Sequence, residues 1–332
     1  MTASTSGFEG PPAGRTTAQA AQPPSRPAGP LHGHLTTTVP RELVHRAAVA
    51  EVVLTGWRRL GEARFAMTAQ WPRGHSFFTP VNGTHHDPLI AAETVRQAGA
   101  LLAHAEFGVP LTHRFLPQEL AFTVRPEQIR VGERPAALDL DVTCSRIRRR
   151  GRRLAGMRVE ARVLREGRLA ARGRFCFSTI SAAGYRRLRP QHVLDAAYRP
   201  LPPAPAAAPA AVGRLCPADV VLSPAGKPGS WHLRADTGHP VLFDHQADHA
   251  PGLLLLEAAR QAATAALDRA PVLPLALDCA FLGPVELDRP CLIETRLLPG
   301  AAPHGPQTVL VTGRQEDRPA FTSALTAAAP PG

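Results

Sequence analysis

Two sets of polar residues with the same spacing interrupt stretches that are otherwise apolar. In each set a glutamate is followed by an arginine three positions later and a glutamine four positions later, so in a helix all three side chains share one face. The sets are Glu93, Arg96 and Gln97, and Glu257, Arg260 and Gln261. A carboxylate and a guanidinium on a buried helix must be paired, either as a structural ion pair or as an acid–base group tuned by burial. We favour the functional site over the structural pair.

Histidines precede both helical stretches and are candidate bases. His249 lies two positions before Pro251, where the second helix is expected to start, and His85 occupies the matching place before the first helix. His245 lies further upstream of the second helix. The positive end of a helix dipole disfavours an imidazolium, so a neutral imidazole that accepts a proton fits this place. A loop histidine that only hydrogen-bonds the backbone is the alternative for each.

The cysteines give no sign of a metal site or a disulfide framework. Five are scattered along the chain without a Cys-x-x-Cys pair or a His/Cys metal spacing, which fits a reducing compartment. There is no Gly-x-Ser-x-Gly nucleophile elbow and no cysteine beside a histidine-bearing turn, so a mechanism through a covalent intermediate is not favoured, and no cofactor is expected. Neither a secretion signal nor a membrane-spanning apolar run is evident, and we expect a cytoplasmic protein without membrane insertion.

The 332-residue chain has a formal charge of +11. Such a charge suits nucleic acid, a membrane surface, a phosphorylated metabolite or an acidic carrier protein, and charge alone does not choose among them. No helix has the basic face of a DNA-recognition helix, so nucleic acid is not an expected partner. The densest basic run, Arg146 to Arg153, surrounds Gly151 and resembles a hairpin turn. A solvated hairpin tip is favoured there over a dedicated docking site.

Two stretches rich in small residues and proline divide the chain. Residues 1–34 have few large apolar side chains and are predicted to be a disordered tail. Residues 200–212 are rich in proline and alanine and are expected to form a stiff spacer that supplies no core side chains. The sequence thus predicts two globular segments, 35–199 and 213–330.

The two segments repeat each other at a shift of 164 positions. At this shift Gly74-His75 meets Gly238-His239, His85 meets His249, and the two Glu-x-x-Arg-Gln sets coincide. After a further two-residue slip, Phe115-Leu116 meets Phe281-Leu282. Matches at polar as well as apolar positions indicate an internal duplication.

Each repeat is predicted to contain one long buried helix followed by strands. The helices are expected near 88–105 and 251–268, because both stretches are apolar nearly all round and Asp87-Pro88 is a good helix start. Alternating segments follow each helix, at 119–124, 137–147, 154–165 and 169–180, and at 275–282, 291–298, 308–314 and 320–327. This order predicts an α+β fold, a tandem double hotdog in which each half is an antiparallel sheet wrapped around its helix. The halves should pair edge to edge as an intramolecular pseudo-dimer.

The residues around both helices resemble the A-factor biosynthesis (AfsA-type) family. The stretch from His239 to Gln261 looks like the second repeat of that family, and the stretch from His85 to Gln97 looks like the first. Val44 to Thr55 and Ala69 to Arg73 are similar to it as well, and the resemblance covers about residues 35–330.

The resemblance implies an acyltransferase that condenses a β-ketoacyl group, delivered on acyl carrier protein, with dihydroxyacetone phosphate on the way to a γ-butyrolactone or butenolide signal. Such a transfer requires a base for the hydroxyl, stabilisation of the thioester oxyanion and a cation for the phosphate. On this basis Glu257 is chosen as the acid or base, with Arg260, Glu93 and His249 as further catalytic candidates. The candidates for substrate binding are Arg96, Gln97, Gln261, His85, His245 and Gly252.

A more distant resemblance leaves alternatives open. Pro251-Gly252 with Glu257 is similar to hotdog β-hydroxyacyl carrier-protein dehydratases, but Phe243 stands where an ungapped alignment places their histidine, and His245 reaches that place only with a two-residue deletion. A hotdog thioesterase or dehydratase acting on acyl thioesters is therefore the alternative enzyme. A non-catalytic protein that binds a lipid signal is the alternative of another class.

Overall fold

Two helices that are apolar on nearly every side form the centres of two matching halves. In the computed structural model, α1 spans Leu89–Ala105 and α3 spans Gly252–Leu267, and most of their side chains are buried. Asp87 lies before α1 as expected, and its Oδ1 accepts a hydrogen bond of 2.9 Å from the backbone N–H of Leu89. The predicted positions of both central helices are confirmed.

The structure describes residues 36–331 apart from 152, 195–197, 269–270 and 300–304. The chain divides into two units, Met1–Thr36 and Thr37–Gly332, and every helix and strand below belongs to the second. The predicted disordered tail, residues 1–34, lies outside the described residues.

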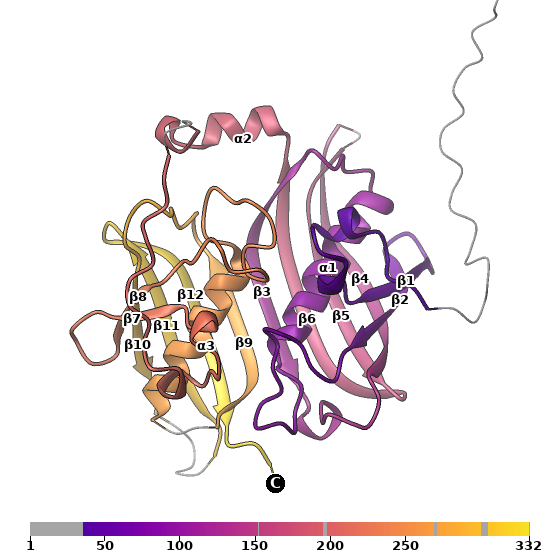
Figure 1. The fold of residues 1–332 in the computed structure, drawn as a ribbon. Coiled ribbons are helices and arrows are strands. Elements are labelled where there is room, and N and C mark those ends of the chain that lie inside the picture. Colours follow the sequence, from indigo (N-terminus) through magenta and orange to yellow (C-terminus); the bar gives the residue numbers. More distant parts are fainter. Residues whose placement is uncertain (1–35, 152, 195–197, 269–270, 300–304, 332) are drawn as a thin grey trace, which may run out of the picture. The chain divides into compact units, whose positions relative to one another are not determined.

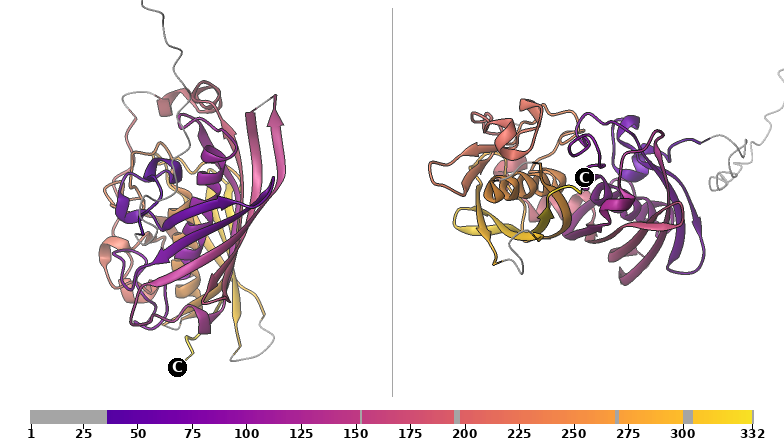
Figure 2. Two further views of the ribbon diagram at one scale, coloured as in Figure 1. Left: turned by 90° about the vertical axis from the view of Figure 1, so that its right-hand side faces the viewer. Right: turned by 90° about the horizontal axis from the view of Figure 1, so that it is seen from below.

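One antiparallel sheet of twelve strands runs through both halves of the described unit, in the order β1-β2-β4-β5-β6-β3-β9-β12-β11-β10-β8-β7. The sheet curves around α1 and α3, which lie on the same side of it (Figures 1 and 2). The strands are Leu54–Arg59 (β1), Arg64–Trp71 (β2), Arg114–Val124 (β3), Ala136–Arg150 (β4), Arg153–Arg165 (β5), Arg168–Ile180 (β6), Leu222–Pro224 (β7), Ser230–Leu233 (β8), Leu273–Phe281 (β9), Leu292–Leu297 (β10), Gln307–Gln315 (β11) and Arg318–Ala328 (β12). A short helix, α2, spans Ala182–Leu188 after β6, and 3₁₀ turns include Arg41–Val44 and Pro209–Val212.

Strands β3 and β9 join the two halves edge to edge. They pair antiparallel from Glu119 opposite Ala280 to Thr123 opposite Ala276. Across this junction, Arg174 on β6 donates a hydrogen bond of 2.9 Å to Asp278 on β9. The predicted fold, two helices each covered by its own part of an antiparallel sheet, and the predicted edge-to-edge pairing are confirmed.

The repeat continues into the strands differently from the sequence-based alignment. In the first half, Val124 on β3 pairs with Ala171 on β6, and in the second half, Phe281 on β9 pairs with Phe321 on β12. Ala171 and Phe321 lie equally far from the turns of their hairpins, β5–β6 and β11–β12. Phe281 therefore corresponds to Val124, and the expected match of Phe281 to Phe115 is wrong. The connection from α3 to β9 is shorter than that from α1 to β3, so the shift of 164 ends with the helices.

Part of the proline- and alanine-rich stretch 200–212 belongs to the core of the second half. Ala207 and Val212 are buried, and the N–H of Ala207 donates a hydrogen bond of 2.9 Å to the carbonyl of Leu222. The expectation that this stretch supplies no core side chains is wrong, because small apolar residues between prolines fill space that a larger side chain would overfill.

Gly173 in β6 allows α1 to lie close against the sheet. A Cβ atom at this position would lie 2.3 Å from Cγ2 of Val95 on α1. We expect Gly173→Ala to lower the free energy of unfolding by about 1–3 kcal/mol, as other over-packed cores do. Gly61→Ala is the matched control, because a Cβ there meets no atom within 4 Å. Thermal unfolding of both variants checks this, and equal midpoints would contradict the tight packing of α1 on β6.

Candidate active site

Two arginines and a glutamine hold the buried carboxylate of Glu93 on α1. This carboxylate accepts hydrogen bonds from Arg46 at 3.0 Å, from Nε of Arg96 at 2.7 Å and from Gln97 at 2.7 Å. Arg46 is buried, whereas the side chain of Arg96 is 22% exposed. Every oxygen of the carboxylate is thus bonded to a donor, and two of the donors are cations.

The same arrangement surrounds Glu257 on α3. Its carboxylate accepts hydrogen bonds from Arg214 at 2.7 Å, from Nε of Arg260 at 2.9 Å and from Gln261. All four residues are buried. The predicted pairing of Glu and Arg on both helices is present, and each pair has a second arginine from elsewhere in the chain.

Both networks cross from one half to the other. Nη1 of Arg46 donates to the carbonyl of Val241 at 3.1 Å, and Nη1 of Arg214 donates to the carbonyl of Phe77 at 2.6 Å. Val241 is the residue of the second repeat that corresponds to Phe77 at the shift of 164, so the two contacts are equivalent in the two halves. The networks therefore fix how the halves meet.

Sequence reasoning missed Arg46 and Arg214. Both arginines lie before the part of the sequence that matches at the shift of 164. They align at a shift of 168 instead, where Val44-His45-Arg46 meets Val212-Gly213-Arg214. Testing several shifts upstream of each helix would have found this signal.

The networks keep both glutamates ionised. Burial alone would raise the pKa of each carboxyl, but Arg46 and Arg96 outweigh it and lower the pKa of Glu93 to about 2. Arg214 and Arg260 do the same for Glu257, again to about 2. A carboxylate with so low a pKa, bonded at both oxygens, is a weak base near neutral pH. The surroundings of Glu257 thus favour a structural role over the predicted acid–base role.

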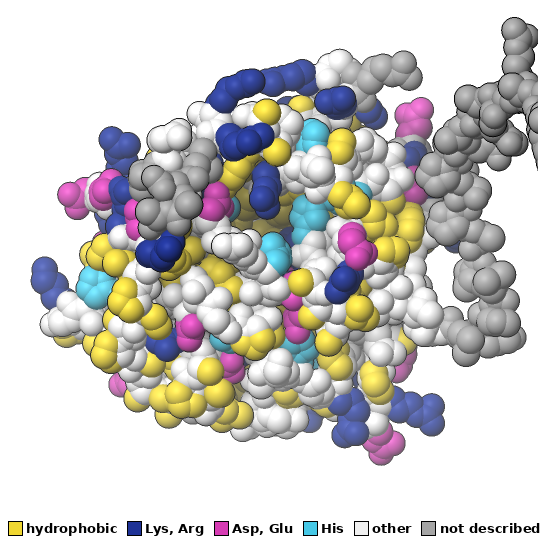
Figure 3. Space-filling model, turned by 45° about the horizontal axis from the view of Figure 1, so that its top comes forward, with side chains coloured by type: hydrophobic (Ala, Val, Ile, Leu, Met, Phe, Trp, Pro, Cys, Tyr) yellow, Lys and Arg dark blue, Asp and Glu magenta, His cyan; other side chains and the backbone are white. Residues whose placement is uncertain are grey.

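A pocket of about 970 Å³ opens where the halves meet. Its walls come from α1, the first turn of α3, strand β3 and the segment that follows β6. Figure 3 shows the hollow, with arginine and histidine side chains around its opening and apolar side chains inside. Of the predicted site residues, those that line it are Glu93, Arg96, His245, His249 and Gly252. Those that do not line this pocket are Gln97, Glu257, Arg260, Gln261 and His85.

His249 forms a dyad with a carboxylate at the pocket. Its Nδ1 lies 2.7 Å from Oδ1 of Asp248. Burial raises the pKa of Asp248, but the hydrogen bond from His249 and the nearby charges outweigh it and hold that pKa well below its usual range. Because an ionised carboxylate only accepts hydrogen bonds, Nδ1 of His249 donates to it, and Nε2 is the ring nitrogen that remains for another partner.

The connecting segment between the halves holds Asp248 in place. The hydroxyl of Tyr185 on α2 donates to its Oδ2 at 2.9 Å, and Nε of Arg189 lies 3.3 Å from the same oxygen. Burial and the charge of Asp248 raise the pKa of Tyr185, so its hydroxyl remains a donor. Sequence reasoning missed Asp248 and Tyr185. Asp248 is adjacent to His249, and that adjacency was its available signal.

His85 does not repeat this arrangement. It is completely buried, its Nδ1 lies 2.8 Å from Oγ1 of Thr84, and its backbone bridges to Val81 and Arg130. The structure does not bring His85 to the pocket that contains His249.

The first turn of α3 lies at the pocket. The turn starts at Pro251, has no side-chain cap, and lines the pocket with Pro251, Gly252 and Leu253. The first N–H groups of a helix have no partner within it, and together with the helix dipole they favour a negatively charged oxygen.

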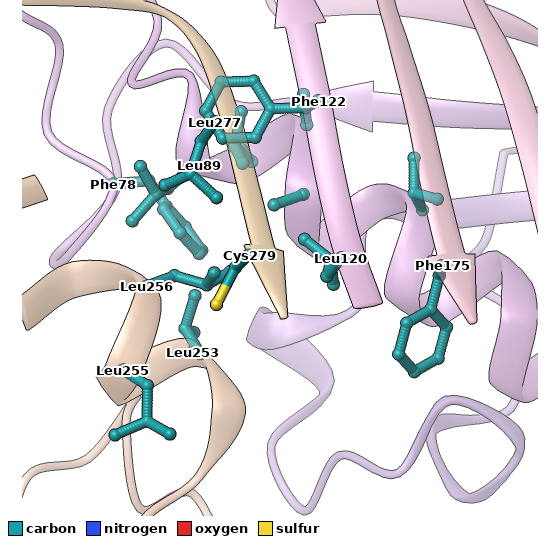
Figure 4. Close-up of a cluster of buried hydrophobic side chains, with 14 of the residues drawn as sticks. Phe78, Leu89, Leu120, Phe122, Phe175, Leu253, Leu255, Leu256, Leu277 and Cys279 are labelled. Atoms are coloured by element: carbon teal, nitrogen blue, oxygen red, sulfur yellow. The ribbon is translucent and has the colours of Figure 1, made fainter. Parts of the chain in front are cut away.

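The pocket combines an apolar interior with a basic rim. The interior includes Leu120, Phe175, Leu253 and Leu256, which belong to the apolar cluster where the halves meet (Figure 4). The rim includes the exposed arginines Arg114 and Arg186. Within the described residues, no group of three His, Cys, Asp or Glu side chains is placed to hold a metal ion. No described helix is long and apolar enough to cross a membrane.

Two wrapped helices under one antiparallel sheet, with a pocket at the junction of the halves, define a double-hotdog protein. The chain belongs to the AfsA family, whose profile, the A-factor biosynthesis hotdog domain, matches residues 31–181 and 196–329. The two matched segments correspond to the two halves of the structure.

Named relatives and solved structures are similar to this chain. A Streptomyces virginiae protein named 2-oxo-3-(phosphooxy)propyl 3-oxoalkanoate synthase is 56% identical over 288 residues, which is 87% of this chain and 97% of that protein. A Streptomyces coelicolor protein of the same name is 41% identical over 288 residues, covering 86% and 90%. The solved acyl-ACP thioesterase from Bacteroides thetaiotaomicron is 10% identical with a TM-score of 0.47, covering 79% of this chain and 97% of its own.

Removing the charge of Glu257 should mainly affect stability. Glu257→Gln leaves Arg214 and Arg260 buried without their counter-charge, so we expect a loss of about 3–5 kcal/mol in the free energy of unfolding. Because the pKa of Glu257 is about 2 in the folded protein and ordinarily 4.5, its ionised form stabilises the fold above about pH 4.5, and this contribution is lost as the pH falls through 2. The variant should therefore lose part of the acid dependence of stability.

Thermal unfolding at several pH values, measured beside enzymatic turnover, checks this expectation. A Glu257→Gln protein that is as stable as the unmodified one but inactive would instead support the acid–base role. Glu93→Gln is the matched variant, because its network is the same and it also borders the pocket.

Proposed function

We propose that this chain is an acyltransferase that moves a 3-oxoacyl group from a thioester to the hydroxyl of dihydroxyacetone phosphate. The name of the relatives describes an ester, and cleavage of that ester between acyl group and oxygen gives these two partners. The single observation that carries the proposal is a pocket that places a histidine–carboxylate dyad and an uncapped helix start beside an apolar interior and a basic rim.

The reaction forms one C–O bond and breaks one C–S bond. The hydroxyl oxygen of the acceptor attacks the thioester carbonyl carbon while Nε2 of His249 takes the hydroxyl proton. The same nitrogen then returns the proton to the departing sulfur, so a single base serves both steps. Asp248 orients the ring through Nδ1 and stabilises the imidazolium that exists between the two transfers.

The first turn of α3 stabilises the charge that develops on the thioester oxygen. In this proposal the N–H groups of Gly252 and Leu253 point toward that oxygen, and the dipole of α3 adds to their effect. His249 immediately precedes this turn, so base and oxyanion donors act on the same carbonyl. Gly252 thus keeps the substrate-binding role that we expected for it.

Rim arginines bind the phosphate of the acceptor. Among the described residues, neither Arg114 nor Arg186 has a carboxylate within ion-pair distance, so both guanidinium groups are available to a phosphate. Arg96, a substrate-binding candidate from the sequence, donates to Glu93 and to the carbonyl of Val44. We therefore place the phosphate at Arg114 and Arg186, with His245 beside it.

We also propose acyl carrier protein as the source of the thioester. Carrier proteins are acidic, and the basic rim of the pocket together with the run Arg146 to Arg153 offers a complementary charge. The run lies at the hairpin between β4 and β5, as expected.

Thiol release measured with and without the acceptor tests the proposed reaction. We expect the 3-oxoacyl thioester of N-acetylcysteamine to release thiol rapidly only when dihydroxyacetone phosphate is present, with the phosphorylated ester detected by mass spectrometry. Equal release in the absence of the acceptor would identify a thioesterase. Loss of water from the matching 3-hydroxyacyl thioester, without release of thiol, would identify a dehydratase, and tight retention without turnover a lipid-binding protein.

Replacing His249 should abolish most of the transfer. His249→Gln removes the proton acceptor but keeps a polar side chain of similar size, so we expect kcat to fall by about 10²–10⁴-fold with little change in thermal stability. Asp248→Asn should also lower kcat, because it no longer stabilises the imidazolium. His85→Gln is the control at the matching position of the first repeat, and a comparable loss of kcat there would contradict the assignment of the pocket.

A further inference from the structure

His45 occupies a backbone conformation that usually selects glycine. It ends the turn Arg41–Val44 with φ 55 and ψ 51, in the left-handed region. In the second half the corresponding turn, Pro209–Val212, ends at Gly213 with φ 69 and ψ 32. A side chain at such a position costs conformational energy, and sites where this cost is retained are often functional.

A second histidine fixes the orientation and tautomer of His45. Nδ1 of His104 lies 2.7 Å from the carbonyl of Val109, and because a carbonyl only accepts, this nitrogen carries the proton. Nε2 of a neutral His104 is then an acceptor, and it lies 2.7 Å from Nε2 of His45. His45 must therefore carry its proton on Nε2, which leaves Nδ1 as an acceptor. The ring of Phe115, edge-on at 4.6 Å between centroids, holds the plane of the imidazole.

Both imidazoles are held in the neutral form that this assignment requires. Burial, followed by the charges of Arg96 and other nearby cationic groups, lowers the pKa of His45 to about 3. Burial also lowers the pKa of His104. His45 lines the pocket, and among the described residues its Nδ1 has no recorded hydrogen-bond partner.

The pair of histidines exists only in the half whose network borders the pocket. At the positions of the second half that correspond to His45 and His104 stand Gly213 and Asp268. Ala100, which lines the pocket, corresponds to Thr264, whose hydroxyl bonds the carbonyl of Arg260. The duplicated halves thus differ in the residues that face this cavity.

The turn of His45 is tied to the loop that carries the dyad. The N–H groups of Ala47 and Ala48 donate to the two carboxylate oxygens of Asp244 at 2.6 and 3.0 Å. His45 and His249 therefore border one pocket, on segments that hold each other in place.

Nδ1 of His45 carries no proton and can only accept a hydrogen bond, which restricts what this side chain can bind. It repels a phosphate and the carbonyl oxygens of the acyl group, since all of these are acceptors themselves. The hydroxyl proton of the acceptor goes to His249 in the proposed reaction. The remaining donors of the reacting pair lie in the arm of a pantetheine-type thiol, where the donor nearest the sulfur is an amide N–H.

We infer that Nδ1 of His45 accepts a hydrogen bond from an amide N–H of the thiol arm of the acyl donor, and that His104 positions it for this role. The inference rests on the proposed function and deepens it. Carrier-protein and coenzyme A thioesters share an amide-bearing thiol arm. Nδ1 of His45 would then account for the preference for such a thiol.

Two donors that differ in one group test the role of His45. The 3-oxoacyl thioesters of N-acetylcysteamine and of 2-mercaptoethyl acetate are alike except that the second has an ester oxygen in place of the amide N–H. We expect the unmodified protein to prefer the amide donor by about 10-fold in kcat/KM, the effect of one good hydrogen bond. The preference should appear in KM, because the bond is made in the ground state and in the transition state alike.

Two variants of His45 form a matched pair. His45→Gly introduces the residue of the second half and should reduce the preference to about 1. His45→Asn tolerates the left-handed backbone and keeps an acceptor near the place of Nδ1, so it should retain much of the preference. Thermal unfolding shows whether either variant is damaged as a whole.

The outcomes separate this inference from the proposed function. Each donor is assayed with and without dihydroxyacetone phosphate. Thiol release that does not depend on the acceptor contradicts the proposed acyl transfer. Acceptor-dependent release with equal kcat/KM for the two donors, or a preference that survives in His45→Gly, overturns the role of His45 alone.

Discussion

The organisation of this protein depends on two buried carboxylates that must each be neutralised. Glu93 and Glu257 lie deep on helices with almost no other polar surface, where a single unpaired charge would prevent folding. The arginine on the same helix bonds both oxygens of each carboxylate, and a second arginine arrives from the turn that precedes each helix in the chain. That second arginine also bonds a carbonyl of the opposite half. Charge compensation inside one half therefore sets the position of the other.

The pocket follows from this arrangement. The networks bring the start of α3 and the middle of α1 to the same cavity, so the first turn of α3 comes from one half and much of the cationic and apolar wall comes from the other. Arg96, partly exposed beside Glu93, marks the half that faces the cavity, whereas Arg260 is buried. Both oxygens of each carboxylate accept hydrogen bonds within the networks. The function proposed above therefore rests on residues beside the networks, above all His249 and Asp248.

Patterns within the sequence predicted both central helices and the long strands of the first half, but not which distant segments contact each other. The all-round apolar stretches identified α1 and α3, and alternation identified the long strands from β3 to β6. Strands β7 and β8, with three and four residues, are too short to show an alternating pattern. The shift of 164 failed after α3 because a shorter connection changes the register, which no local pattern records.

The same limit explains the site. His249 and Gly252 were found because proximity to a helix start is visible in the chain, and both line the pocket. The role of Glu257 stays a prediction, and its second arginine, 43 positions away, could not be seen from spacing. Tyr185 and Arg189 reach Asp248 from the connection between the halves, and only the folded chain brings them there.

The continuous sheet across β3 and β9 has a consequence for how such a protein changes. When two identical subunits meet, every substitution appears on both sides of the interface, and the assembly dissociates on dilution. Here both halves belong to one chain, so their association does not depend on concentration and each substitution occurs once. A glycine can stay at position 213 while a histidine occupies position 45. One half can thus be refined for substrate while the other is retained as its scaffold.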